Sequence, residues 1–260
     1  MGISVQFTVL QKGAVSPTAD QLKRAFKSFS NLTDADAVRL SVGARGILMK
    51  HLSQDAARAL QSALQAEGCP VAVLAEDDLP KLPDGRSLQR LDLWPQSLVT
   101  YDLLGRPNPV SWSQVTLVAA GSAHHFEVHK TQSERTVLRF NPIAGLRAKK
   151  IVESAHTVAP GSQLLLEIFL ADGVTRYQID AAQFAFRQVI DRPGLSTGEK
   201  FVWLVREVCR QTSGAIFNQG ARLLHEGAEV APEYTNRQVF QDEIVWLLWR
   251  AAQQKRHEAA

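Results

Sequence analysis

The chain has 260 residues, of which 45% are apolar and 21% are charged, and its formal net charge is +3. This composition excludes an intrinsically disordered chain, which has fewer apolar residues and a larger net charge. The small net charge also excludes a chain that is basic throughout, so any attraction for anions must come from a local patch.

The N-terminal sequence MGISVQFTVL lacks the basic start and the apolar core of a signal peptide. Gln6 stands where a myristoylation site has Ser or Thr. No apolar run of the sequence reaches the roughly 20 residues that a membrane-spanning helix needs. We therefore expect a cytoplasmic protein without a transmembrane segment.

The two cysteines, Cys69 and Cys209, lie in apolar surroundings far apart in the sequence. The chain has no CxxC pair, which excludes a zinc-ribbon framework. We expect two buried, reduced thiols rather than a disulfide.

Residues 1–77 are predicted to form a small domain that begins with a strand. In this strand apolar residues alternate with polar ones, which is the period of a half-buried strand: Ile3, Val5, Phe7 and Val9. Thr18 and Gln21 form a capping box, which predicts the start of a helix. Thr33 and Asp36 resemble a weaker cap and predict a short helix at 35–40.

The rest of this domain is predicted to be a strand, a helix and a strand. Gly43 and Gly46 precede a short apolar strand at 47–49. Ser53 predicts the start of a helix that Gly68 ends, and an apolar strand follows at 71–74. The complete order is typical of an α/β sandwich with helices on one face of a small sheet.

This order, and the run LSQDAARALQSALQAEGCPVAVL, resemble the C-terminal domain of the ribosomal stalk protein family. In that family an Ala- and Leu-rich helix ends at a glycine and leads into the closing strand. The family recruits translation GTPases through a basic helical face, and Lys23, Arg24 and Lys27 lie on the comparable helix. SFSNLTDA replaces the family's glycine-rich turn between its first two helices, so the resemblance implies the fold more than the recruitment. A ribosome- or RNA-associated factor is one hypothesis.

A linker is predicted at 78–90. The stretch EDDLPKLPDGRSLQR, residues 76–90, contains two prolines, one glycine and seven charged residues. The acidic run Glu76, Asp77 and Asp78 has the chemistry to bind a cation, although such charge runs are usually solvated.

Residues 91–260 are predicted to form a β-rich domain with C-terminal helices. LVTYDLLGRPNPVSWSQVTLVAAG reads as strand, turn, strand, strand, and further strands are predicted at 123–129, 135–140, 163–170 and 174–180. Asp172-Gly173 predicts a hairpin between the last two. Ser196 and Glu199 form a capping box for an amphipathic helix. This domain resembles a pleckstrin-homology-like barrel, a fold that implies binding of phosphoinositides, peptides or proteins. The sequence thus predicts an α+β protein.

The last helix is predicted at 236–254, and its central part is apolar nearly all round. Two interpretations stay open. One face would pack on the parent domain while the other forms a homo-oligomer seam or receives a partner. Alternatively, the helix is buried between the two domains.

The stretch GSAHHFEVHK, residues 121–130, offers a candidate metal site. On a strand, His125, Glu127 and His129 lie on one side, while Phe126 and Val128 lie on the other. Two imidazoles and a carboxylate are suitable ligands for zinc or iron with one open position. The alternative is a solvated strand face. The metal site would make the chain a metal-dependent enzyme or a metal-binding protein.

The following segment, residues 130–150, concentrates positive charge in what reads as a loop. Its basic residues, set against the single acid Glu134, are Lys130, Arg135, Arg139, Arg147, Lys149 and Lys150. Such a patch can bind phosphate groups or an acidic partner surface. Aromatic residues do not alternate with the charges, so we expect no sequence-specific nucleic-acid recognition.

No P-loop, GxGxxG, GxSxG, HExxH or EF-hand motif is present in the sequence. The leading interpretation is a non-enzymatic cytoplasmic interaction or scaffold protein that needs no cofactor. It would bind a protein partner or an anionic surface through the basic segment and the last helix.

Overall fold

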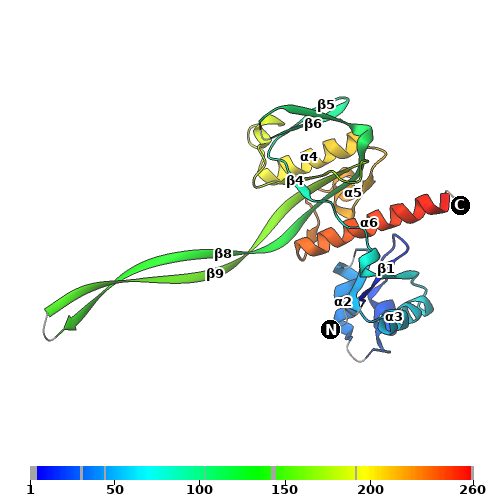
Figure 1. The fold of residues 1–260 in the computed structure, drawn as a ribbon, viewed down its shortest axis with the longest axis horizontal. Helices are drawn as coiled ribbons and strands as arrows, with labels where there is room; N and C mark the ends of the chain where they lie inside the picture. Colours follow the sequence, from blue (N-terminus) through cyan, green and yellow to red (C-terminus); the bar gives the residue numbers. More distant parts are fainter. Residues whose placement is uncertain are drawn as a thin grey trace. The chain divides into compact units, whose positions relative to one another are not determined.

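The computed structural model describes residues 5–29, 32–43, 45–102, 104–141, 145–190 and 192–258, with side chains described in these ranges outside 125–160. The chain divides into two compact units (Figure 1). Unit 1 consists of Met1–Ala123 and Gln163–Ala260, and unit 2 of His124–Ser162.

The N-terminal part of unit 1 has the predicted order of strand, helix, helix, strand, helix and strand. Its elements are β1 (Phe7–Gln11), α1 (Ala19–Phe26), α2 (Asp34–Gly43), β2 (Ile47–Leu52), α3 (Gln54–Ala66) and β3 (Val71–Ala75). The strands form a sheet in the order β2-β1-β3, and both pairs are antiparallel.

The predicted helix caps of this part are confirmed. Thr18 Oγ1 accepts a hydrogen bond from Gln21 N at 3.3 Å, and Gln21 Oε1 accepts one from Thr18 N at 2.9 Å. Ser53 Oγ accepts from Ala56 N at 3.3 Å. Each cap satisfies an amide that has no partner within its own helix, which is why these helices begin at these residues.

The first sheet separates two buried clusters. Val9 and Leu48 face a cluster that α1, α2 and α3 complete. Their neighbours Leu10 and Ile47 belong to a second cluster, which also contains residues of the C-terminal helix. Both faces of this small sheet are therefore covered, the second by the C-terminal helix rather than by the sheet's own helices.

The β-rich part of unit 1 has two sheets. β5 (Leu91–Trp94), β6 (Ser97–Tyr101) and β7 (Pro107–Ser111) form an antiparallel three-stranded sheet. The second sheet has the order β11-β8-β9-β10-β4, with β12 also paired to β8. Its strands are β4 (Gly85–Ser87), β8 (Val115–Asn141), β9 (Gly145–Leu170), β10 (Arg176–Asp180), β11 (Ile216–Phe217) and β12 (Glu233–Tyr234). β4 lies within the predicted linker and pairs in parallel with β10.

Helices complete this part. They are α4 (Thr197–Gln211), α5 (Gln219–His225) and α6 (Arg237–Glu258), with 3₁₀ turns at Glu76–Asp78, Trp112–Gln114 and Phe186–Gln188. The predicted capping box of α4 is confirmed, since Ser196 Oγ accepts from Glu199 N at 3.2 Å. Leu98 of the small sheet, Ile168 of the large sheet and Phe201 of α4 lie in one fully buried cluster. The α+β class is confirmed, while the barrel resemblance stays a prediction.

Two strand predictions are corrected in their extent. Residues 123–129 and 135–140, predicted as separate strands, belong to the single strand β8. Continuous pairing with β9 carries the strand through the polar residues between them, which interrupt the apolar alternation. The hairpin predicted at Asp172-Gly173 is confirmed by the antiparallel pairing of β9 with β10.

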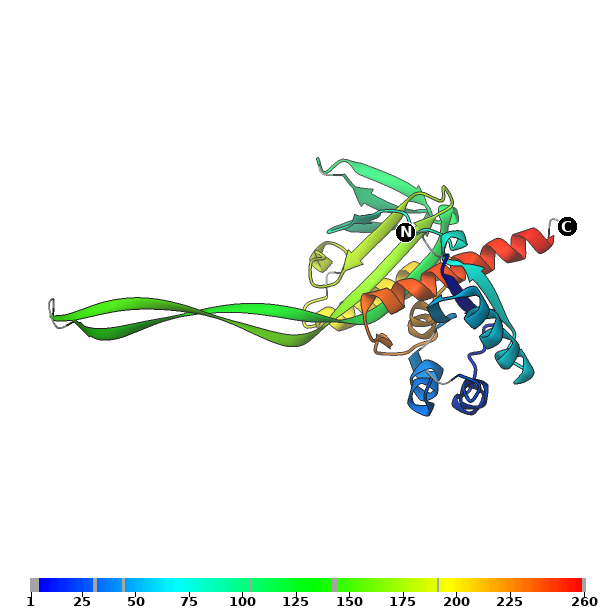
Figure 2. The ribbon, with the colours of Figure 1, turned by 60° about the horizontal axis from the view of Figure 1, so that its bottom comes forward.

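α6 lies between the N-terminal part and the β-rich part (Figures 1 and 2). A single buried cluster joins Phe240 and Ile244 of α6 to Leu10 of β1 and Leu117 of β8. Of the two interpretations of this helix, the structure therefore shows the one in which it is buried within the chain. Assembly of copies through α6 stays a prediction that the structure does not test.

Trp246 attaches α6 to the first sheet. Its Nε1 donates a hydrogen bond to Gln11 O at 2.7 Å. Its ring fills the place that a Cβ on Gly46 would occupy, 2.0 Å from the nearest ring atom, and the φ of Gly46 is +93°. Lys50 Nζ forms a second attachment, an ion pair with Asp242 Oδ1 at 2.6 Å.

Among the described residues, no helix combines the length and the apolar character that crossing a membrane requires.

Both cysteines are buried thiols, as predicted. Burial raises the pKa of Cys209 from 9.0 to about 12, so the folded protein keeps a proton that the unfolded chain releases above pH 9. Stability must therefore fall as the pH rises through this window, by up to about 1.4 kcal/mol per pH unit for this group.

We expect the free energy of urea unfolding to decline between pH 9 and 10.5 and to decline less steeply in Cys209→Ala. The comparison concerns the pH slope, because the alanine variant also loses packing at every pH. The pKa of Tyr234 is also raised well above its ordinary value, by burial and by the charge of Glu243. The stability of the alanine variant should therefore still decline somewhat with pH. Equal slopes in the two proteins would contradict the assignment to Cys209.

Candidate functional site

Unit 2 is a two-stranded β-ribbon, called the arm below. It consists of residues 124–162, in which the second part of β8 and the first part of β9 run side by side (Figure 1). At about 3.3 Å per residue, its β8 segment is roughly 60 Å long. A hairpin of this kind is at best marginally stable alone, so its strands need support where they begin and end.

The residues of the predicted metal site and of the predicted basic patch all lie on the arm. His125, Glu127 and His129 lie on β8, as do three of the basic residues, Lys130, Arg135 and Arg139, and the other three, Arg147, Lys149 and Lys150, lie on β9. The side chains of all nine lie outside the described residues, so whether they come together stays a prediction. Among the described residues no group of three or more His, Cys, Asp or Glu could hold a metal ion.

The description of the basic segment as a loop was wrong. The structure has strand at 130–141 and at 145–150. The stretches Thr136-Val137-Leu138 and Lys150-Ile151-Val152 contain β-branched residues that favour a strand in spite of the charges around them.

The arm carries the net charge of the whole chain. It contains six Lys and Arg residues and three Glu residues, which leaves a surplus of +3. The rest of the chain contains equal numbers of acidic and basic residues. The net positive charge of the chain therefore equals that of the arm.

Unit 1 holds the first part of β8 firmly. Leu117 and Val118 pair with β11, and Ser122 and Ala123 pair with β12. The end of β9 pairs with β10 over Leu165–Phe169. Both strands are thus integrated into a sheet up to the boundary of the arm.

Asn218 is the centre of this support. Its Oδ1 accepts hydrogen bonds from Ala120 N at 2.9 Å and Ala221 N at 2.8 Å, and its Nδ2 donates to Ala120 O at 3.1 Å and Tyr234 Oη at 2.9 Å. The side chain is fully buried. It joins β8 to the start of α5 and to β12, and its loss would leave several buried polar groups unpaired.

Glu243 completes the same buried network from α6. Tyr234 Oη donates to its Oε2 at 2.5 Å, and Gln219 N donates to its Oε1 at 2.8 Å. The sequence analysis missed Asn218, Tyr234 and Glu243. Only Asn218 had a local signal, since an Asn three residues before a backbone amide that it caps is a common helix start.

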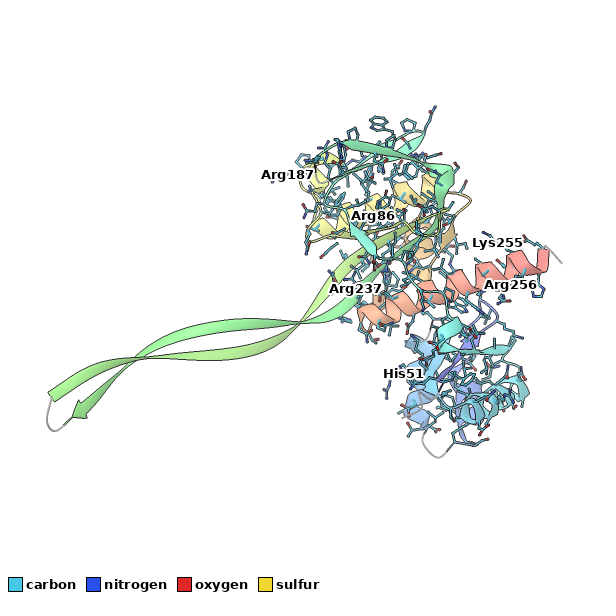
Figure 3. The ribbon with its side chains drawn as sticks, in the orientation of Figure 1. His51, Arg86, Arg187, Arg237, Lys255 and Arg256 are labelled. Atoms are coloured by element: carbon cyan, nitrogen blue, oxygen red, sulfur yellow. The ribbon has the colours of Figure 1, made fainter. Side chains whose placement is uncertain are left out.

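Arg24 of α1 and Glu76 of the acidic run have partners within unit 1. Arg24 Nε forms an ion pair with Glu67 Oε2 at 2.6 Å, Lys23 is half-buried and Lys27 is exposed. Glu76 Oε1 accepts from His51 N at 2.6 Å (Figure 3 labels His51). Glu76 therefore binds groups of the first sheet.

A cavity of about 890 Å³ lies in unit 1 between the predicted linker, the large sheet and the second half of α6. Trp112, Leu117, Phe169 and Leu248 give it apolar walls. Lys255, which Figure 3 shows near the end of α6, also lines this cavity.

A scan of family models and searches of curated proteins and of solved structures find no match for this chain, so a functional assignment depends on the geometry described above.

Proposed function

We propose that the chain is a non-enzymatic cytoplasmic protein that binds an anionic macromolecular surface with its arm. The observation that carries the proposal is that the arm, a compact unit of its own, holds the whole positive surplus of the chain. Unit 1 supports the arm through the pairing of β8 with β11 and β12. The pleckstrin-homology-like resemblance also favours binding over catalysis.

The backbone of double-stranded nucleic acid is the anionic surface that best matches a ribbon of this form. A major groove about 12 Å wide admits a two-stranded β-ribbon. Lys and Arg side chains on such a ribbon bind phosphates irrespective of base sequence. This agrees with the expectation that the chain reads no specific sequence.

The test is fluorescence anisotropy of a labelled 30-base-pair duplex, titrated with protein at several salt concentrations. The arm variant combines Arg147→Glu, Lys149→Glu and Lys150→Glu. We expect at least about tenfold weaker binding, and a slope of log K against log salt that is shallower by about 2.7 if all three residues contact phosphates.

A matched control changes the net charge equally on unit 1. Arg187, Arg237 and Arg256 are exposed, and Figure 3 shows them away from one another, Arg237 and Arg256 near the two ends of α6 and Arg187 in the 3₁₀ turn Phe186–Gln188. Their combined replacement by Glu should weaken duplex binding less than about threefold. Equal losses of duplex affinity in the two variants would contradict the proposal. So would duplex binding by the wild type that does not depend on the salt concentration. If the protein bound polyglutamate but not the duplex, the proposed partner would be an acidic protein surface instead of nucleic acid.

A further inference from the structure

A second cavity, of about 160 Å³, lies within unit 1 and differs in character from the apolar one. Four segments supply its walls: the end of β1, the turn before β2, the start of α5 and the middle of α6. It is smaller than the 300–1,000 Å³ typical of sites for drug-sized ligands. Only a ligand of a few atoms fits it.

Three arginines line this cavity: Arg45, Arg222 and Arg250. Within the described part of the chain none of them forms an ion pair. Glu243 is the only carboxylate among the lining residues. Its Oε2 accepts a hydrogen bond from Tyr234 Oη, and its Oε1 accepts one from Gln219 N. The lining therefore has a formal charge of +2.

Aromatic rings orient two of these groups. The guanidinium of Arg45 lies 4.1 Å from the centroid of the Tyr234 ring, and that of Arg250 lies 4.8 Å from the Trp246 ring. Stacking of this kind fixes the plane of the guanidinium and leaves its charge available. Arg45 Nη2 already donates to Glu233 O at 3.3 Å, so Arg45 offers its Nη1 to a ligand. Arg250 is held in place for a bidentate contact with an oxyanion.

Two buried donors at the cavity have no acceptor among the residues that the structure describes. These are Gln11 Nε2, on a side chain that is 3% exposed, and Arg45 Nη1. Gln11 cannot turn away easily, because its backbone N donates to Gly46 O at 2.8 Å and its backbone O accepts from Trp246 Nε1 at 2.7 Å. Buried donors are rarely left unpaired in folded proteins, and here both belong to residues that line the same small cavity.

We propose that this cavity is a binding site for inorganic phosphate. A monohydrogen phosphate dianion matches the +2 charge, and its oxygens can accept from the three arginines and from Gln11. Glu243 adds selectivity, because its carboxylate can accept the proton that phosphate keeps at neutral pH. Sulfate has no such proton and would face the carboxylate unfavourably. Bound phosphate would connect β1, α5 and α6, which come from both ends of the chain.

The test is isothermal titration calorimetry of the full chain with sodium phosphate and, separately, with sodium sulfate at matched ionic strength. We expect phosphate to bind with at least tenfold higher affinity than sulfate. A parallel thermal melt at no more than 5 mM anion should show stabilisation by phosphate. Low concentrations matter because both anions stabilise proteins non-specifically when concentrated.

Arg222→Gln is the decisive variant, because Arg222 is exposed and its replacement should leave the fold intact. It should weaken phosphate binding at least tenfold. Arg90→Gln is the matched control, since Arg90 also stacks on a ring, at 3.9 Å from the Tyr101 centroid, but does not line this cavity. No binding of phosphate by the wild type, equal binding of sulfate, or equal loss in the two variants would overturn the proposal. All these residues belong to unit 1, so failure of the arm hypothesis would not affect the outcome.

Discussion

Replacement of Gly220 by alanine should lower the free energy of unfolding by about 3–5 kcal/mol, among the largest effects expected of a single methyl group. A Cβ built on Gly220 lies 1.8 Å from Ala120 O and 2.8 Å from Ala120 C. Both are backbone atoms of β8, so no side-chain rotation can relieve the overlap. Either α5 or β8 must move by more than an ångström.

The surrounding hydrogen bonds oppose such a movement. The Asn218 side chain binds both backbone groups of Ala120 and caps α5 through Ala221 N. A shift of α5 away from β8 would stretch these buried bonds, and each buried polar group left without a partner costs about 1–3 kcal/mol. The overlap and the lost bonds therefore act together.

Gly198→Ala is the matched control for this prediction. Gly198 is the second residue of α4, as Gly220 is of α5, and its nearest neighbour to a new Cβ is Ser196 Oγ at 4.0 Å. The control should be neutral or stabilising by up to about 1 kcal/mol, because alanine favours the helix more than glycine does. Urea unfolding followed by circular dichroism measures both variants. Similar stabilities for the two would mean that α5 does not lie against β8 as closely as described.

The features that the sequence predicts correctly are those with a local cause. The caps at Thr18, Ser53 and Ser196 each depend on residues within four positions, so a short stretch of sequence contains all the information. The same holds for the Asp172-Gly173 hairpin. The α+β class follows from such elements taken in order.

The features that it misses depend on distant segments. β8 continues through His129 and Lys130 because β9 pairs with it, although the local apolar alternation stops. The second face of the first sheet is covered by α6, and nothing near β1 indicates this. The cavity arginines provide the clearest case, because Arg45 and Arg250 stand about 200 positions apart and neither belongs to a recognisable motif.

A buried ion pair in the large sheet gives the second large effect. Arg176 Nε and Nη2 donate to the two carboxylate oxygens of Glu167, both at 2.8 Å, and the two side chains are 6% and 1% exposed. Gln178 Nε2 donates to Glu167 Oε1 at 3.0 Å. Arg176 Nη1 also donates to Pro83 O at 3.2 Å, which attaches the predicted linker to the sheet.

Glu167→Met and Arg176→Met should each lower the free energy of unfolding by about 3–5 kcal/mol, because each leaves the other charge buried without its partner. The double variant, with two apolar side chains in van der Waals contact, should be more stable than either single variant and fall within about 2 kcal/mol of the wild type. The positive coupling in this double-mutant cycle is the decisive quantity. Urea unfolding of the four proteins measures it.

An exposed pair on α4 serves as the control for the cycle. Arg210 forms a similar two-bond contact with Glu207, but its side chain is 66% exposed. Arg210→Met should cost less than about 1 kcal/mol, because water already solvates both charges. If Arg176→Met lowered the free energy of unfolding no more than Arg210→Met does, water would have to reach the Glu167 carboxylate. The sheet would then be open beside β4, and the attachment of the linker through Pro83 would contribute little to the stability of the fold.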